Sequence, residues 1–326
     1  GYHDQTQSIF ATAQLGWKSK LYLDVTGRVD WSSALAWTDT KSVAYPSVGV
    51  SAILTELLPI KNNVLTFLKV RGSYSEVGNA PTRYIAYQTY PYESASPVTA
   101  TTYPNTDIKP ERTKAWEVGL QSHLWNDKLE LNVSLYKTST YNQLFNPSIS
   151  ASSGYSSIYI NGGQVDNKGI EASLTLNQPL GPVQWNSTFT YTINRNKIKK
   201  LLKPTTLSNG EVVKQDMMDL GGLEIVNSRL FEGGSIGDLY VTALRTDSHG
   251  YIDVDYVNNT VAIDNKAGER QDGWIYAGNS QAKYMMGWRN SFSWKGLTLG
   301  CLVNARIGGI VVSQTQAMMD AYGVST

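Results

Sequence analysis

Apolar and polar side chains alternate with a period of two over long stretches of this sequence. Between residues 128 and 139, for example, Leu131 and Val133 alternate with Asn132 and Ser134. Successive side chains of an extended chain point to opposite faces, so this period predicts amphipathic β-strands rather than helices. Ten strands are expected, at residues 7–17, 20–31, 45–55, 64–75, 113–124, 128–139, 167–178, 183–194, 284–294 and 297–307.

The predicted strands are long, and the connections between them alternate in length. The strands are about twice the 5–6 residues of a typical globular strand and match the roughly 9–11 residues that cross a bilayer. Short links are expected at 18–19, 56–63, 126–127, 179–182 and 295–296, and long links at 32–44, 76–112, 140–166 and 195–283. Outer-membrane barrels alternate short periplasmic turns with long extracellular loops in this way. We therefore expect residues 195–283 to form a long extracellular loop region.

Tryptophans gather near the ends of the predicted strands. Four of them stand beside short turns, and Trp31 and Trp288 stand toward the opposite strand ends. Indole favours a membrane interface, where its ring is buried and its N–H stays hydrated. The predicted membrane-interface aromatics are Trp17, Trp31, Trp125, Trp185, Trp288 and Trp294. The alternative is that these rings simply end strands inside a soluble core.

The second face of the predicted strands carries Glu, Asp, Asn, Gln, Ser and Thr. Because buried polar groups need hydrogen-bond partners, this face favours water or a polar plug over a second packed sheet. The predicted fold class is all-β, an antiparallel transmembrane β-barrel segment of about ten strands. Nothing pairs strand 7–17 with strand 297–307, and open edges do not persist in lipid. We therefore expect a single segment, residues 1–326, of a larger barrel.

Composition removes several classes of function. The 28 Lys+Arg residues and 27 Asp+Glu residues leave a net charge of +1, so no global field favours nucleic acid. Cys301 is the one cysteine, which excludes a disulfide within the chain, and three scattered histidines disfavour a zinc site. No run of 18 apolar residues occurs, which excludes transmembrane helices but not transmembrane strands.

Several segments resemble one family, the SusC/RagA-like TonB-dependent transporters. The stretch from Lys109 to Gly119, KPERTKAWEVG, resembles the family's K-P-E-x-T-x-x-W-E-x-G motif at the start of a barrel strand. The stretch from Asn161 to Glu171, NGGQVDNKGIE, is similar to its N-x-G-x-v-x-N-K-G-x-E segment. Tyr136-Lys137-Thr138, Gly237-Asp238-Leu239-Tyr240 and the hairpin from Tyr284 to Gly309 also match, in the family's order.

The resemblance implies the C-terminal half of a 22-stranded outer-membrane barrel. Its implied partners are a SusD-like surface lipoprotein, outer-membrane lipid, and TonB acting through a plug and TonB-contact segment expected outside residues 1–326. Its implied cargo is an oligosaccharide or a peptide, and it implies neither a cofactor nor nucleic acid as a ligand. The resemblance therefore implies that the chain supplies barrel wall and outer loops of an importer and is not an enzyme.

Tyrosines mark one long connection as a candidate binding surface. Tyr rings stack on sugars and pack against peptides, and their hydroxyl groups add hydrogen bonds. The candidate substrate- or partner-binding residues are Tyr84, Tyr87, Tyr90, Tyr92 and Tyr103. The alternative is that these rings and the neighbouring prolines pack the loop on itself.

A few acidic residues and one histidine give weaker candidates for chemistry. Asp247, Asp253 and Asp255 are weak candidates for a loop cation, although the spacing does not fit an EF-hand. An outer-membrane protease on a ten-stranded barrel would require a histidine paired with an aspartate for general-base catalysis. His249 is the candidate, because Asp247 and Asp253 lie near it in the sequence. We expect no catalytic site and no metal. The same strand pattern is also compatible with a passive porin and with a soluble carbohydrate-binding β-protein.

Basic residues cluster just beyond strand 183–194. They are Arg195, Lys197, Lys199, Lys200 and Lys203. We expect them to form a solvated extension of the strand, and the alternative is binding to lipopolysaccharide phosphates or to an acidic partner.

Overall fold

The computed structural model describes most of the chain. The described residues are 3–58, 60, 63–88, 90, 92–93, 96–97, 101–146, 154–201, 205–206, 210, 212–213, 217–223, 226–257, 260–322 and 324. They form two compact units. The first unit comprises Gly1–Gln215 and Tyr284–Ala305, and the second comprises Asp216–Lys283 and Arg306–Thr326.

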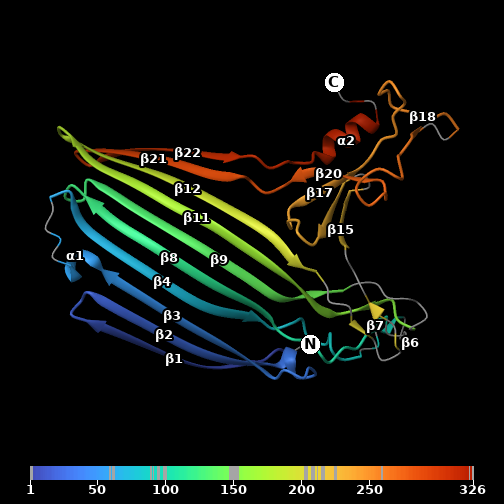
Figure 1. The fold of residues 1–326 in the computed structure, drawn as a ribbon, viewed down its shortest axis with the longest axis horizontal. Coiled ribbons are helices and arrows are strands. Elements are labelled where there is room, and N and C mark those ends of the chain that lie inside the picture. Colours follow the sequence, from blue (N-terminus) through green and yellow to red (C-terminus); the bar gives the residue numbers. More distant parts are fainter. Residues whose placement is uncertain are drawn as a thin grey trace. The chain divides into compact units, whose positions relative to one another are not determined.

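A ten-stranded antiparallel sheet forms the first unit (Figure 1). Its strands lie side by side in chain order: β1 (Thr6–Trp17), β2 (Leu21–Ser32), β3 (Ser42–Ile53), β4 (Leu65–Asn79), β8 (Glu111–Leu124), β9 (Leu129–Phe145), β11 (Ile160–Leu180), β12 (Val183–Lys200), β21 (Tyr284–Trp294) and β22 (Leu297–Ile307). The predicted all-β, antiparallel architecture is confirmed. The described sheet is open, with β1 and β22 at its two edges.

Short turns lie at one end of this sheet, and the long connections leave from the other end (Figure 1). Lys18 and Ser19 both have positive φ, 49° and 57°, which is the backbone of a two-residue hairpin turn that follows the strand twist. Lys295 and Gly296 repeat this geometry between β21 and β22, with φ of 44° and 88°. A four-residue helix, α1 (Leu54–Leu57), begins the connection between β3 and β4.

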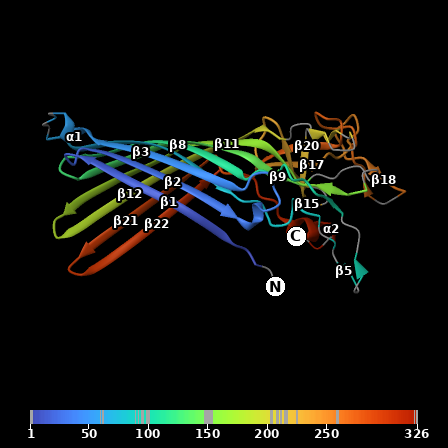
Figure 2. The ribbon, with the colours of Figure 1, turned by 90° about the horizontal axis from the view of Figure 1, so that it is seen from below.

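The strand register places the apolar side chains on one face. Leu23 stands opposite Leu15 on β1 and opposite Val50 on β3, and cross-strand partners share a face. No layer of described residues covers this face, because Val118 is 62% exposed and Leu135 is 51% exposed. The sheet is a single curved layer (Figure 2). A soluble sandwich would bury these side chains against a second sheet.

The buried apolar side chains of the first unit lie at the end with the long connections. They are Leu35, Val43, Ile85, Ala86, Ile108, Ile158, Ile160, Val165, Ile198 and Leu201. The connections of this unit also contain short elements, which are η1 (Ser33–Leu35), β5 (Tyr92–Glu93), β6 (Ser96–Pro97), β7 (Thr102–Tyr103), β10 (Ser157–Ile158), β13 (Thr205–Thr206) and β14 (Val212–Val213). The water-excluded core of this unit therefore holds its loops together, while the apolar face of the strands stays uncovered.

The second unit has a small sheet of its own. Its four antiparallel strands are β15 (Met217–Leu223), β16 (Val226–Phe231), β17 (Asp238–Thr242) and β20 (Trp274–Asn279). The hairpin of β18 (Val254–Asp255) and β19 (Thr260–Val261) and the helix α2 (Gln314–Ala321) complete it. Residues 195–283, predicted as one long loop, thus hold the end of β12 and most of a folded unit. In the described part of the chain, every helix is too short or too polar to cross a membrane.

Candidate functional site

Three long connections of the first unit pack together into one structure, which we call the loop cap. It consists of the described residues of 33–41, 80–110 and 154–159. Ile108 at its centre is fully buried, and the main-chain N–H of Asp39 donates to the carbonyl of Thr106 at 3.1 Å. β7 and β10 join as a short parallel pair. The loop cap is therefore a fixed surface rather than a set of independent loops.

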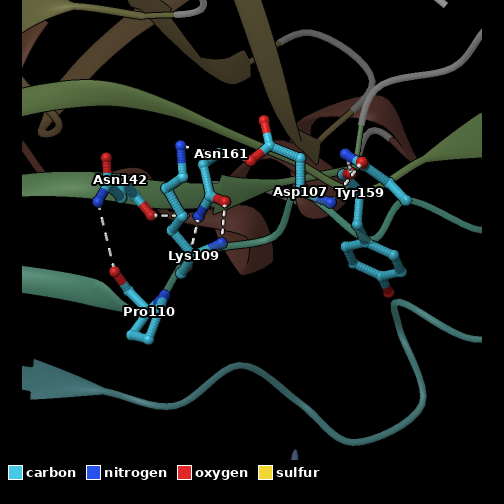
Figure 3. A network of polar contacts seen from close by, with 7 residues as sticks. Asp107, Lys109, Pro110, Asn142, Tyr159 and Asn161 are labelled. Atoms are coloured by element: carbon cyan, nitrogen blue, oxygen red, sulfur yellow. Dashed lines mark hydrogen bonds and ion pairs between the residues drawn. The ribbon is translucent and has the colours of Figure 1, made fainter. Parts of the chain in front are cut away.

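One asparagine joins the loop cap to the ends of three strands (Figure 3). The Asn161 side chain donates from Nδ2 to the carbonyls of Lys109 and Asn142, both at 2.8 Å, and its Oδ1 accepts from the Lys109 N–H at 2.5 Å. Asn142 in turn donates to the carbonyl of Pro110. The two sequence motifs that begin at Lys109 and Asn161 therefore form one contact.

The predicted binding tyrosines divide into two groups. Tyr84, Tyr87 and Tyr90 are exposed, whereas Tyr103 is half-buried and packs edge-on against Tyr155 with ring centroids 5.3 Å apart. Tyr84 has a φ of 62°. The side chain of Tyr92 lies outside the described residues.

A tryptophan that the sequence did not single out completes the exposed group. The ring of Tyr87 lies 4.5 Å from that of Trp37, and the two residues are 49% and 50% exposed. We call these two rings the aromatic pair. Trp37 lies in the connection 32–44. The sequence around Trp37 does not indicate that its ring contacts Tyr87, which is 50 residues away. The loop cap therefore presents two flat rings to solvent.

The predicted interface tryptophans lie on the uncovered surface of the sheet. Trp17, Trp125 and Trp294 are exposed at the short turns, and Trp31 is exposed at the far end of β2. The indole of Trp185 donates to Asn290 at 3.1 Å, and that of Trp288, in the middle of β21, donates to Ser187 at 3.0 Å.

At the loop end, the apolar face carries an aromatic contact that was not predicted from the sequence. Trp116 of β8 is exposed, and its ring lies 4.4 Å from that of Tyr74 on β4. Trp116 stands two residues before Val118 on β8, so strict alternation along this strand places both side chains on the apolar face.

The polar face of the sheet satisfies its side chains by contacts along the surface. The Arg71 guanidinium reaches Ser134 at 2.6 Å and forms an ion pair with Glu117 at 3.3 Å. Nearer β1, Gln14 donates to Asp24 at 2.6 Å. These bonds join strands of the same sheet without a second layer, so this face suits contact with water.

The acidic candidates in the second unit make separate local contacts. Asp247 accepts from the N–H groups of His249 and Tyr251, Asp253 pairs with Arg245 at 2.7 Å, and Asp255 accepts from the N–H of Val257. Among the described residues, no three His, Cys, Asp or Glu side chains converge on one point.

Two of the three histidines, His123 and His249, lie in different units of the fold. His249 Nδ1 lies 3.8 Å from Asp247 Oδ2 on an exposed turn of the second unit. His123 Nδ1 lies 2.6 Å from Asp127 Oδ1 at a short turn of the first unit.

Burial raises the pKa of Tyr240 in the second unit, and the negative charge of Asp238 adds to this rise. Its ring lies between those of Phe231 and Tyr276, at centroid distances of 5.2 and 5.6 Å. The phenol therefore stays protonated and neutral in its aromatic setting, which indicates a structural residue of this small sheet.

Comparison with known proteins identifies the class that this fold represents. The family model described as "TonB dependent receptor-like, beta-barrel" matches residues 1–300. TonB-dependent receptor P3 of Formosa agariphila is 24% identical over 340 residues, which cover 96% of this chain and 33% of that protein. TonB-dependent receptor P26 of the same organism is 26% identical over 71% of this chain and 24% of its own length.

Solved structures show the same fold. The RagAB peptide importer in its open-open state aligns with a TM-score of 0.72 and 21% identity, over 94% of this chain and 33% of that chain. The outer membrane transporter YddB from Escherichia coli aligns with a TM-score of 0.51 and 12% identity, over 96% of this chain and 35% of that chain.

The chain belongs to the TonB-dependent receptor β-barrel family. Proteins with this barrel are outer-membrane proteins, so the uncovered apolar face of the sheet is its lipid-facing surface. The chain spans about a third of the length of the curated relative that it matches over 96% of its residues.

Proposed function

We propose that this chain forms part of the wall and outer loops of a TonB-dependent importer of oligosaccharides or peptides. The importer works with a SusD-like surface lipoprotein, and the loop cap faces the outside of the cell. Open strands β1 and β22 pair with further strands to close the barrel, since unpaired edges are not stable in lipid.

The observation that carries this proposal is the aromatic pair on the loop cap. Trp37 and Tyr87 keep about half of their surface exposed although a packed core lies beneath them. Exposed rings on a fixed support lose little entropy on binding, and they suit the faces of sugars and the side chains of peptides. The similarity to a structure described as a peptide importer supports the same kind of cargo.

The test uses the full-length protein with its outer-membrane assembly intact. Replacing both Trp37 and Tyr87 with Ala should weaken binding of the cargo or of the lipoprotein by about tenfold or more, as expected for two central aromatic contacts. Binding is measured by titration calorimetry, with mixed oligopeptides and mixed oligosaccharides in separate arms. The matched control is Tyr256→Ala, which removes an exposed ring from the second unit.

Three results would contradict the proposal. If the double variant assembles and binds cargo and lipoprotein as tightly as the native protein, the aromatic pair is not the contact. If Tyr256→Ala gives the larger loss, the contact lies on the second unit. Uptake that continues after TonB is removed would indicate a passive porin.

A further inference from the structure

A tyrosine side chain lies along the polar face of the sheet. The register places Tyr136 of β9 directly opposite Gly169 of β11, and Gly169 directly opposite Asn194 of β12. A Cβ atom at Gly169 would stand 2.5 Å from the Tyr136 hydroxyl oxygen, so the phenol occupies the space above the glycine. The same hydroxyl donates to Asn194 Oδ1 at 3.3 Å. The Tyr136 side chain therefore crosses β11 along the wall instead of projecting from it.

Three asparagine amides continue from the hydroxyl end of this tyrosine. Asn194 Nδ2 donates to Asn167 Oδ1 at 3.2 Å, and Asn196 Nδ2 donates to the same oxygen at 2.9 Å. Asn167 thus uses its oxygen twice, while its own Nδ2 has no hydrogen-bond partner among the described residues. Because an amide nitrogen carries two N–H donors, Asn167 keeps both of them available for a ligand.

A carboxylate stands on the other side of the tyrosine. Glu171 follows Gly169 by two residues on β11, so it shares the polar face, and its side chain is exposed. Glu171 forms no hydrogen bond or ion pair with the described part of the chain. Arg71, which reaches the neighbouring Ser134, has its own ion pair with Glu117 at 3.3 Å. Since the polar face of such a barrel lines its interior, Glu171 presents free acceptor oxygens there.

The spacing of these groups suits a single sugar ring. Asn167 and Glu171 are four residues apart on β11, which is about 14 Å at roughly 3.4 Å per residue, and the phenol lies over Gly169 midway between them. The face of an aromatic ring carries a negative partial charge, which attracts the C–H groups of a sugar face. Each sugar hydroxyl both donates and accepts, so hydroxyls pair with a carboxylate at one end and with amide N–H groups at the other. We call Tyr136, Asn167, Glu171 and Asn194 the wall cluster.

We propose that the wall cluster binds one ring of a neutral oligosaccharide on the inner wall of the barrel. The sugar ring packs on the open face of Tyr136, two adjacent hydroxyls donate to Glu171, and the amide of Asn167 donates to a hydroxyl at the far end. This inference rests on the proposed importer function and narrows its cargo.

The chemistry of the wall cluster favours a neutral sugar over other cargo. Glu171 would repel a sugar that carries a carboxylate of its own. The main-chain N–H groups of an extended peptide point alternately to opposite sides, so two neighbouring groups do not reach one carboxylate. A peptide whose arginine pairs with Glu171 is the competing ligand, because a guanidinium offers two donors side by side.

The test measures binding to the full-length protein in a nonionic detergent. An array of neutral oligosaccharides of glucose, mannose and galactose is screened, and the tightest binder is titrated by calorimetry. Arginine-containing oligopeptides form a separate arm. Tyr136→Leu removes the ring, Tyr136→Phe keeps the ring face without the hydroxyl, and Glu171→Gln removes the charge. The matched control is Tyr22→Leu, which removes a tyrosine that also lies beside a glycine, Gly16, on the polar face.

We expect Tyr136→Leu and Glu171→Gln each to weaken oligosaccharide binding by about tenfold, through loss of a stacking ring and of a charge-assisted hydrogen bond. Tyr136→Phe should weaken it by about threefold or less, because the ring face remains. Tyr22→Leu should bind the oligosaccharide as tightly as the native protein does. Binding of the oligopeptides should be the same in all of these proteins.

Equal oligosaccharide binding by Tyr136→Leu and the native protein overturns the inference. So does a native protein that binds no neutral oligosaccharide of the array, and if it binds the oligopeptides the importer function still stands. Losses of equal size for oligosaccharides and oligopeptides would mean that the change disturbs the barrel interior or a plug within it, which also overturns the inference.

Heat-modifiable gel mobility shows whether each variant assembles. Should Tyr136→Leu fail to assemble, Glu171→Gln decides the matter: a loss of about fivefold or more supports the inference, and no loss overturns it. Oligosaccharide binding that depends on Tyr136, in a protein whose uptake continues without TonB, would support the site and contradict the importer function.

Discussion

The side-chain amide of Asn161 and the main chain of Lys109 hold each other by two hydrogen bonds across 52 residues of sequence. Lys109 precedes β8 and Asn161 lies at the start of β11, with β9 between them in the sheet. The same amide also binds the carbonyl of Asn142 on β9. One side chain thus fixes where the loop cap joins three neighbouring strands.

Replacing Asn161 with Ala should loosen the loop cap and leave the strands intact. The change leaves the Lys109 N–H and two carbonyls without their partner, at a cost of about 1–3 kcal/mol. Hydrogen exchange at the Lys109 amide should speed up by roughly tenfold or more, through local opening. Asn304→Ala, at an exposed position of β22, is the control and should leave this exchange rate unchanged. Equal rates in all three proteins would show that the amide does not hold the loop cap.

Gly169 of β11 should resist even the smallest substitution. A Cβ atom at this position would stand 2.3 Å from the carbonyl oxygen of Ile193 and 2.5 Å from the Tyr136 hydroxyl. Because backbone cannot move aside easily, Gly169→Ala should cost about 1–3 kcal/mol and reduce the assembled fraction. Gly27→Ala on β2 is the matched control, since a Cβ there has no atom within 4 Å. Heat-modifiable gel mobility measures both, and equal assembly would contradict the close approach.

The two faces of β11 should respond oppositely to a new positive charge. Leu174 lies on the lipid-facing surface between Leu131 and Phe189, whereas the adjacent Ser173 lies between Asn132 and Thr190 on the polar face. Leu174→Arg should destabilise the barrel by about 2–4 kcal/mol near the membrane midplane, and Ser173→Arg by much less. Urea unfolding in lipid vesicles measures both. A larger cost at Ser173 would mean that the faces are reversed.

The stability of the second unit should depend on a buried cation, the guanidinium of Arg229. The Arg229 side chain is 7% exposed and pairs with Asp272 at 2.9 Å, and its guanidinium lies 5.1 Å from the ring centre of Trp274. Asp272→Ala leaves this charge with the longer 3.6 Å ion pair to Asp219 and should cost about 2–4 kcal/mol. Asp253→Ala breaks an exposed pair with Arg245 and should cost less than about 1 kcal/mol. Limited proteolysis within residues 217–283 of the full-length protein compares the two, and equal protection would refute the difference.

The sequence predicted the strands and their faces well, because alternation is a local property. The ten-stranded sheet and its apolar face follow from the period of two. The four-stranded sheet within residues 195–283 was not predicted. Its strands are short, at 5–7 residues, and one of them carries two glycines, so each shows too few alternating positions to stand out from a loop.

By itself, the sequence determined which side chains share a strand, which face each occupies and which family the motifs resemble. Only the tertiary structure decided which strands are neighbours in register, and therefore that Trp37 meets Tyr87, that Asn161 binds Lys109, and that a tyrosine of β9 reaches across β11 to β12. The physical reason is that alternation depends on backbone geometry within one strand. Contacts between strands depend on register and loop packing over tens of residues, and no local pattern records these.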